Sequence, residues 1–413
     1  MSARVWERRP LGAVADLCLG KMLDQKKNRG EPLPYLANVN VRWGEFVLDN
    51  LRTMRFEPKE FERYGLKFGD IVMCEGGEPG RCAIWKNQTS QMMIQKALHR
   101  IRPKETLDYR FLFYNLLHLG QTKAFDQYFT GSTIKHLPGE KLAKVEVVVP
   151  PSPVQRRIAA ILSAYDDLIE NNTRRIAILE EMARRIYEEW FVRFRFPGHE
   201  QVKRVESELG LIPEGWKVVA ASDAITINPK VRVPKEGLKP FVPMGSLSEN
   251  SMLIADIEER EGNSGSKFQN GDTLFARITP CLENGKTGFV QFLPSHDAVA
   301  FGSTEFIVLR SRTLCPEYVY ALARSDEFRA NAIKSMSGAT GRQRVKEACF
   351  DAFLLAQPDA ETLQRYREIA QPMFAMIRKL AAKNANLRAT RDLLLPKLIS
   401  GELDVSTLSE PTV

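Results

Sequence analysis

The sequence lacks the residue patterns that most metal sites and membrane proteins require. Its 413 residues include only 6 cysteines and 5 histidines, without the C-x-x-C spacing or the i, i+4 histidine pair typical of metal sites. No apolar run approaches the roughly 20 residues needed to cross a bilayer, and the N-terminus has no apolar core of a signal peptide. We therefore expect reduced thiols, no bound metal, no membrane contact and a cytoplasmic location.

Phosphate- and cofactor-binding loops are also missing. The glycine-rich stretch Gly76–Gly80 lacks the Lys-Ser/Thr ending of a P-loop, and no G-x-G-x-x-G motif follows a strand and opens a helix. The prolines at 150–151 lie outside the Asn/Asp-Pro-Pro-Tyr/Phe arrangement of amino-methyltransferases. These absences predict a chain with no catalytic residues and no cofactor, although spacing alone leaves a composite site open.

The chain is basic overall, but its charge is distributed unevenly. The formal net charge is +8, which permits a nucleic-acid partner. Residues 1–153 carry 24 basic and 17 acidic side chains, hence +7, whereas residues 199–357 carry 19 and 20, hence −1. If the second region contacts DNA, it must do so through a local basic patch.

An internal repeat of about half the chain length is the most informative feature of the sequence. Gly69–Asp70 precedes an apolar run in the first half, and Gly271–Asp272 does the same 271 − 69 = 202 residues later. Pro151 and Pro358 each precede a long charged helix and lie 358 − 151 = 207 residues apart. A repeat of this length indicates a duplicated unit of one domain and one helix.

The two repeated regions have the composition of mixed α/β domains. Short apolar runs bounded by Gly, Pro and Asn predict strands, and helices are predicted at Tyr109–Leu119 and Glu317–Ala332. The predicted fold is α+β, with two similar mixed α/β domains separated by two long helices packed as an antiparallel coiled coil. The predicted boundaries are 1–153 for the first domain, 154–198 for the central helix, 199–357 for the second domain, 358–403 for the C-terminal helix and 404–413 for a tail.

Both long segments have the 3-4 apolar spacing of a coiled-coil seam. The first has no Gly or Pro between Val154 and Arg195, and in the second Pro372 is expected to kink or divide the helix near its start. The predicted seam residues are Ile158, Ile161, Tyr165, Leu168, Asn172, Leu179, Met182 and Ile186 in the first helix, and Ile377, Leu380, Asn384, Leu387 and Leu394 in the second.

A narrow apolar stripe does not stabilise a single helix in water, so each helix needs a partner. We predict that the two helices pack against each other and that Asn172 meets Asn384, because a polar residue on a seam commonly fixes the register. The alternative is two separate helices, each docked on its own domain.

Four clusters of polar side chains have the chemistry to contact DNA. Asn and Arg pair bidentately with adenine and guanine, and basic residues near a glycine-rich turn suit phosphate. The clusters are Asn38–Gly44, Gln91–Arg102, Phe275–Lys286, and the stretch Gly131–Lys135 with its counterpart Gly338–Lys346. An ordinary turn, solvated strand or hairpin explains each cluster as well. The residues predicted to bind DNA are Asn38, Asn40, Arg42, Trp43, Arg81, Gln95, Lys96, Lys135, Arg277, Thr279, Asn284, Lys286, Thr340, Arg342, Gln343 and Arg344.

Over essentially its whole length, the chain resembles the specificity subunits of type I restriction-modification systems. The resemblance lies in the order domain, long helix, domain, long helix, and in local matches to this family. The local matches are Leu179–Ala183 leading to Trp190-Phe191, the C-terminal stretch Leu393–Leu403, and the stretches Gly69–Trp85 and Leu274–Lys286, which look like the target-recognition modules of this family.

The resemblance implies a non-catalytic subunit that binds double-stranded DNA, two methyltransferase (modification) subunits and the restriction/translocase subunits. Each domain would read one half of a bipartite target, and the helices would set the gap between the halves. S-adenosylmethionine would bind the methyltransferase partner, so no cofactor is expected on this chain. The outward helix residues Arg174, Arg175, Arg184 and Arg185 would dock the modification subunits.

Two other functions stay open from the sequence. A coiled-coil scaffold whose domains bind proteins would not retain DNA, even with its partners present. A DNA methyltransferase fused to a recognition domain would bind S-adenosylmethionine by itself, although the missing cofactor loop argues against it.

Overall fold

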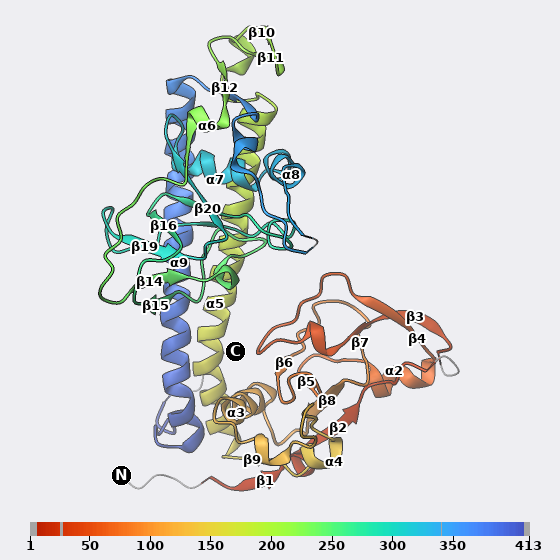
Figure 1. The fold of residues 1–413 in the computed structure, drawn as a ribbon. Coiled ribbons are helices and arrows are strands. Elements are labelled where there is room, and N and C mark those ends of the chain that lie inside the picture. The colour runs from red at the N-terminus through yellow and green to blue at the C-terminus, as the bar shows by residue number, and fades with distance from the viewer. Residues whose placement is uncertain (1–5, 25–27, 340, 409–413) are drawn as a thin grey trace. The chain divides into compact units, whose positions relative to one another are not determined.

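The computed structural model describes residues 6–24, 28–339 and 341–408 (Figure 1). These residues form two compact units: unit 1 comprises residues 1–169 and 386–413, and unit 2 comprises residues 170–385. Each unit contains one mixed α/β domain together with part of each long helix. The long helices are α5, Ser152–Tyr187, and α9, Ala360–Ser400.

The domain of unit 1 is built on two small sheets. The first is antiparallel with strand order β2-β8-β5-β6, and the second has the order β4-β3-β7 with β3 and β7 parallel. A separate antiparallel pair joins β1, at the start of the domain, to β9, which lies just before α5 in the chain. The strands are β1 Arg8–Pro10, β2 Ala15–Leu19, β3 Glu31–Leu36, β4 Arg52–Phe56, β5 Ile71–Cys74, β6 Cys82–Ile84, β7 Met93–Ile94, β8 Leu98–Pro103 and β9 Glu146–Val148, and the helices are α1 Leu11–Val14, α2 Pro58–Tyr64, α3 Tyr109–Gln121 and α4 Gly139–Leu142.

The domain of unit 2 repeats this plan. Its antiparallel sheet has the order β13-β20-β17-β18, its second sheet has the order β15-β14-β19-β16 with β14 and β19 parallel, and β12 pairs with β21. A hairpin, β10-β11, follows the central helix in the chain. The strands are β10 Arg204–Ser207, β11 Gly210–Pro213, β12 Lys217–Ala220, β13 Ile225–Ile227, β14 Lys239–Val242, β15 Glu258–Arg260, β16 Ser266–Gln269, β17 Thr273–Ala276, β18 Thr287–Phe289, β19 Val299–Gly302, β20 Phe306–Ser311 and β21 Leu354–Gln357, and the helices are α6 Ala221–Ala224, α7 Pro316–Arg324 and α8 Asp326–Lys334.

The predicted duplication is confirmed down to single hydrogen bonds. Asp70 pairs with Arg102 in unit 1, and Asp272 pairs with Arg310 in unit 2, each through carboxylate–guanidinium contacts of 2.7 Å or less. Both aspartates are only 1% exposed, and each also accepts a backbone N–H bond from the residue three positions earlier. The Gly-Asp repeat in the sequence therefore marks a buried ion pair that ties neighbouring strands together in both domains.

The long helices contact each other in both units and run antiparallel. In unit 2, the Asn172 side chain donates a hydrogen bond to Asn384 at 2.8 Å, and the Trp190 ring lies 6.1 Å from that of Tyr366. Residue numbers thus rise on α5 while they fall on α9. In unit 1, apolar side chains from both helices join one core cluster that also contains the domain. The predicted contact between Asn172 and Asn384 is therefore present in the structure.

The predicted seam of α5 is one residue out of phase over part of its length. Leu168 and Met182 are 47% and 44% exposed, whereas the adjacent Ile169 and Ala183 are buried. The prediction for Leu168 and Met182 is wrong because alternating steps of 3 and 4 residues fit the sequence in either order. The buried positions of α5 are Val154, Gln155, Ile158, Ala159, Leu162, Ile169, Asn172, Ile176, Ala183 and Tyr187.

The other predicted seam residues lie on the inner side of their helices to different degrees. Those fully buried are Ile158, Asn172, Ile377, Leu380 and Asn384, and those half-buried are Ile161, Tyr165, Leu179, Ile186, Leu387 and Leu394. Half-burial is expected in a two-helix packing, because neither helix surrounds the other.

Two predicted helix boundaries differ from the structure. Pro372 does not divide α9, which is a single helix of 41 residues. Conversely, the helix predicted over Glu317–Ala332 is divided into α7 and α8 at Ser325, whose hydroxyl caps α8 by accepting a bond from the N–H of Phe328. Serine competes for backbone bonds and so favours such a break.

Two expected absences can be examined in the described residues. Among them, no helix combines the length and apolar composition needed to span a membrane. In the same part of the chain, no group of three or more His, Cys, Asp and Glu side chains could hold a metal ion. All six cysteines are free thiols.

Candidate nucleic-acid interface

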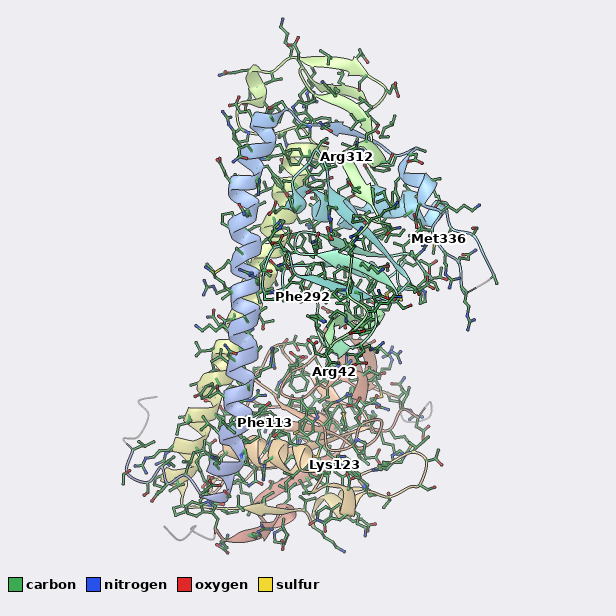
Figure 2. The ribbon with its side chains drawn as sticks, turned by 60° about the vertical axis from the view of Figure 1, so that its left-hand side comes forward. Arg42, Phe113, Lys123, Phe292, Arg312 and Met336 are labelled. Carbon is green, nitrogen blue, oxygen red and sulfur yellow. The ribbon has the colours of Figure 1, made fainter. Side chains whose placement is uncertain are left out.

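In each domain, three loops converge beyond the strands that carry the buried ion pair. We call this region the loop edge, comprising residues 38–46, 75–81 and 130–137 in unit 1 and residues 244–254, 277–286 and 337–345 in unit 2. In unit 1, His136 forms isolated β-bridges with Gly76 and Thr130; in unit 2, Arg344 forms the same two bridges with Ile278 and Ser337. His136 and Arg344 therefore occupy equivalent positions in their own domains. In unit 2, Arg344 is bridged to Ser337, the residue after Met336, which Figure 2 labels.

The first loop of unit 1 holds its own shape through side-chain bonds. Asn40 accepts from the N–H of Ala37 at 2.9 Å and donates to the carbonyl of Val47 at 3.0 Å. Because the oxygen and the nitrogen of its amide both form hydrogen bonds inside the loop, Asn40 stabilises the loop and its amide is not available to contact bases. Arg42, labelled in Figure 2, is exposed, and one of its amino groups donates to the carbonyls of Val39 and Val41.

Trp43 is 40% exposed and rests on the end of α3. A Cβ atom added to Gly120 would lie 2.4 Å from the indole, so only glycine lets the ring approach α3 this closely. Asn38, in the same loop, is half-buried, and its carbonyl accepts a bond from Arg81 at 3.0 Å. These contacts fix the loop while leaving an edge of the indole in solvent.

The other residues of unit 1 that are predicted to bind DNA differ in their exposure and in the contacts that they already make. Arg81 is mostly buried and pairs with Glu78 at 2.8 Å. Gln95 is half-buried and accepts a bond from a backbone N–H, whereas Lys96 is exposed. Lys135 lies 5.5 Å over the ring of Phe129 and 3.7 Å from a carboxylate. Lys96 and Lys135 are thus the exposed cations of this set.

In unit 2, two predicted arginines already have carboxylate partners. Arg344 forms a bidentate pair with Glu305, with contacts of 2.6 and 2.9 Å. The Arg344 guanidinium holds the pKa of the Glu305 carboxyl below its ordinary value. Arg277 pairs with Glu347 at 3.0 Å and donates to the carbonyl of Val345. Carboxylates thus hold both arginines in place, and a ligand that bound either guanidinium would compete with these acids.

The other predicted residues of unit 2 surround these arginines. Thr279 and Gln343 pair through their backbones, and the Thr279 hydroxyl accepts the N–H of Gln343. Asn284 donates to Glu249 at 3.1 Å. Arg342 is exposed, while Lys286 points its ammonium toward the carbonyl of Met244 at 3.4 Å. Thr340 lies outside the described residues.

Sequence reasoning missed a clamp on the loop edge of unit 2. Arg324, the last residue of α7, donates to the carbonyls of Gly285 and Glu249, each at 2.9 Å. A single guanidinium therefore holds two of the three loops. A basic residue in the last turn of a helix is common, so nothing in the sequence distinguished Arg324.

A second clamp comes from the long helix. The carboxylate of Glu180 on α5 accepts bonds from the hydroxyl of Ser251 and the N–H of Met252, both at 2.7 Å. Burial raises the pKa of the Glu180 carboxyl. Two adjacent glutamates on a charged helix, as at 180–181, are typical of a solvated acidic face. The structure instead turns Glu180 toward the domain.

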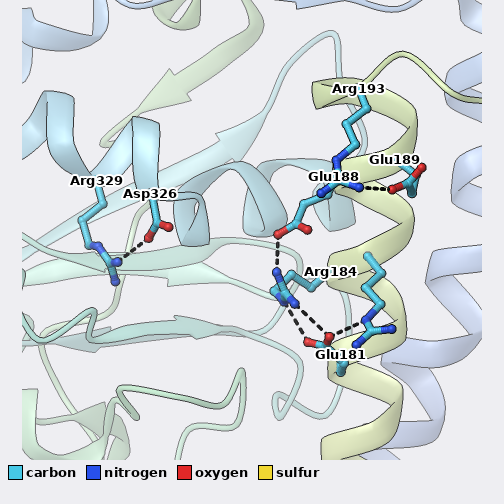
Figure 3. Close-up of polar contacts among 8 residues, drawn as sticks. Glu181, Arg184, Glu188, Glu189, Arg193, Asp326 and Arg329 are labelled. Carbon is cyan, nitrogen blue, oxygen red and sulfur yellow. Dashed lines mark hydrogen bonds and ion pairs between the residues drawn. The ribbon is translucent and has the colours of Figure 1, made fainter.

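The four arginines predicted to dock a partner lie on the exposed side of α5. Figure 3 shows the part of this face around Glu181, which pairs with Arg184 and Arg185, while Arg184 also pairs with Glu188. Hydrogen bonds from these two arginines lower the pKa of the Glu181 carboxyl to about 2. Such i, i+3 and i, i+4 pairs stabilise the helix modestly.

Exposed apolar side chains lie among these charges. Ile178 and Met182 are 52% and 44% exposed on α5, and Met376 is 40% exposed on α9. Arg175, Ile178, Met182 and Arg185 follow steps of 3, 4 and 3 residues and so share one face of α5. Apolar side chains framed by arginines are typical of a protein-binding surface rather than of a purely solvated helix face.

Comparisons with known proteins agree on one family. Residues 4–181 match the family model of the type I restriction modification DNA specificity domain. The type I restriction enzyme MjaVIII specificity subunit of Methanocaldococcus jannaschii is 30% identical over 355 residues, which is 82% of this chain and 80% of that protein. The MjaIX specificity subunit of the same organism is 24% identical over 427 residues, covering 98% and 94%.

A solved structure shows the same fold. The S subunit of a type I restriction-modification system from M. genitalium superimposes with a TM-score of 0.54 at 13% identity, covering 98% of each chain.

Proposed function

The chain belongs to the family of type I restriction enzyme specificity subunits, and from this premise we propose that each of its domains reads one half of a bipartite DNA target. The two loop edges would supply the base and phosphate contacts. The long helices would set the gap between the two halves. Contacts to phosphates would position the duplex, and a minority of contacts would read base edges.

One observation carries this proposal: the two domains share a scaffold but differ in chemistry at equivalent positions. The buried Asp–Arg pair and the β-bridges recur in both domains. Yet His136 in unit 1 corresponds to Arg344 in unit 2, and Glu75 to Arg277. A common scaffold with different loop chemistry is what two different half-sequences require, because discrimination depends on the donors and acceptors presented to base edges.

We assign the methylation and cleavage chemistry to partner subunits. The chain would dock two methyltransferase subunits through the outward faces of α5 and α9, where Ile178, Met182 and Met376 are exposed among arginines. Restriction/translocase subunits would join this assembly, and the whole complex would act in the cytoplasm. S-adenosylmethionine would bind the methyltransferase subunits.

The direct test is to co-express the chain with a methyltransferase subunit and to map the adenines that become methylated. We expect two short specified sequences separated by a gap of constant length. A loop-edge variant of unit 2 should relax only one of the two sequences. A single continuous target, or a complex that does not retain DNA, would contradict the proposal and favour a protein-binding scaffold.

A further inference from the structure

Unit 2 contains an open cleft of about 490 Å³ whose lining is basic. Three cations line it, Lys230, Lys267 and Arg277, together with the polar residues Asn228, Ser266 and Thr304, and the lining includes no carboxylate. Lys230 is exposed and Lys267 half-exposed. Within the described residues, neither lysine has an ion-pair partner, so their charges face solvent uncompensated.

The equivalent place in unit 1 can be identified from the strand register. Asp16 pairs with Arg102 on β2 and β8, and Thr226 pairs with Arg310 on β13 and β20, where both arginines hold the buried aspartates. Two residues further along the strands, Cys18 lies opposite Arg100 in unit 1. In unit 2 the same step leads to residues 228 and 308, and both of these line the cleft.

Helix α2 covers this place in unit 1. The thiol of Cys18 and the guanidinium of Arg100 both donate to the carbonyl of Arg63 near the end of α2. Beside them, the buried ammonium of Lys21 pairs with the carboxylate of Glu60 at 2.6 Å, with 5% and 19% of the two side chains exposed. Thus α2 brings a carboxylate and backbone carbonyls to the cations of unit 1.

Unit 2 has no helix at this position. The pairing register makes Arg52 equivalent to Glu258, and Gly65 equivalent to Lys267. The connection between these positions has 65 − 52 = 13 steps in unit 1 but only 267 − 258 = 9 steps in unit 2. The shorter connection turns at Gly265, whose φ is +114° and where a Cβ atom would lie 1.9 Å from a carbonyl oxygen. The shorter connection forms no helix over the cleft, and its glutamates, Glu258, Glu259 and Glu261, do not line it.

We propose that a phosphate group of the DNA backbone fills this cleft, with Lys230 and Lys267 as its cationic ligands. This inference rests on the proposed function and names a contact outside the predicted recognition residues. Lysine ammonium groups are point charges suited to phosphate. The cleft is continuous with the loop edge, because Arg277 belongs to both and Thr304 precedes the partner of Arg344. That continuity favours the duplex over an acidic protein segment as the occupant.

The test uses the complex of the full chain with a methyltransferase subunit and a duplex that contains its mapped target. Lys230→Gln combined with Lys267→Gln should weaken binding and reduce the slope of log affinity against log salt by about 1, since one phosphate contact contributes about 0.9. The methylated sequence should stay the same, because phosphate contacts carry no direct base information. Lys230→Arg combined with Lys267→Arg should keep the slope of the unmodified complex.

A matched control replaces two exposed lysines outside the cleft, Lys203→Gln with Lys217→Gln. An unchanged slope in the cleft variant, or an equal fall in the control, would overturn the assignment. Loss of the methyltransferase subunit from the cleft variant would also overturn it and indicate an acidic protein ligand. If the unmodified complex failed to bind DNA, the proposed function itself would fail, which is a different result from a cleft variant with an unchanged slope.

Discussion

The loop edges of the two domains differ in charge although their scaffolds agree. In unit 1, Glu75 and His136 lie 3.3 Å apart at the equivalents of Arg277 and Arg344. In unit 2, the arginines at those positions are each held by a carboxylate from elsewhere, Glu347 or Glu305. The fold thus determines the positions of these loop side chains, whereas their charge can change, as from Glu75 to Arg277, without loss of the β-bridges that hold the loops.

The largest effect should come from removing the shared buried ion pair. Asp272→Ala removes two charge-assisted hydrogen bonds from Arg310 and leaves the N–H of Gln269 unpaired, so we expect a loss of about 3 kcal/mol in the stability of unit 2. Asp70→Ala should do the same in unit 1. Hydrogen exchange would show whether protection falls only in β17 and β20, or only in β5 and β8. The exposed Asp167→Ala serves as control; loss of protection in both units from one variant would refute a separate anchor in each domain.

The helix contacts offer a second comparison between the units. In unit 1, Asp166 binds both Arg391 and the hydroxyl of Tyr114, whereas unit 2 has the neutral pair of Asn172 and Asn384. Asn384→Leu should destabilise the helix pair by about 1–3 kcal/mol, since it leaves a buried amide unpaired.

The double variant sharpens this second comparison. Asn172→Leu together with Asn384→Leu should recover most of the loss, because two apolar residues can pack together, but it should weaken the preference for one register. Thermal unfolding followed by circular dichroism measures the stability. Equal destabilisation by the single and double variants would show that the amide–amide bond is not what the single variant removes.

A smaller effect should distinguish free from paired arginines on the loop edge of unit 2. Arg342 is exposed and Arg344 is paired with Glu305. Arg342→Ala combined with Arg344→Ala should weaken DNA binding by the assembled complex and flatten its salt dependence. Arg342→Ala alone should account for about one unit of slope. Salt titrations of the complex measure both variants, and an unchanged slope in the double variant would reject this part of the interface.

The smallest effect concerns the acid that holds Arg344. Because Arg344 lowers the pKa of Glu305, the folded state keeps this carboxyl ionised below its ordinary value of 4.5. The pair therefore stabilises the fold above about pH 4.5, and the contribution is lost as the pH falls through the lowered pKa. NMR titration of the Glu305 carboxyl should show its pKa rising in Arg344→Gln. An identical titration in both proteins would mean that the bidentate pair does not persist in solution.

The sequence predicted the duplicated fold because its strongest signals were local or periodic. The Gly-Asp repeat, the two long helices and the Asn172–Asn384 contact all follow from spacing. Spacing did not predict which residues of α5 form the seam, because Leu168 and Ile169 are both apolar and only packing decides which one is buried. The residue types suggested the candidate DNA contacts, but they could not show that the Asn40 amide already forms hydrogen bonds within its own loop.

The clamp residues lay beyond sequence reasoning for a related reason. Arg324 and Glu180 form hydrogen bonds with backbone groups of loops that are distant in the sequence. Every residue has such backbone groups, so the loop sequence does not show that they are bound. The basic cleft was equally hidden, because it exists only where a helix present in one domain is missing from the other.

The bonds from Glu180 to the loop at Ser251 and Met252 have a mechanical consequence. Any movement of this loop would be transmitted to α5 at Glu180, and the next residue, Glu181, lies about 100° further round the helix in the solvent-facing network of Arg184 and Arg185. Under the proposed function, one peptide bond separates the residue that holds a loop at the DNA from the helix face that docks a methyltransferase subunit. DNA held by the loop and a methyltransferase subunit held by α5 would then be connected through neighbouring residues of one helix.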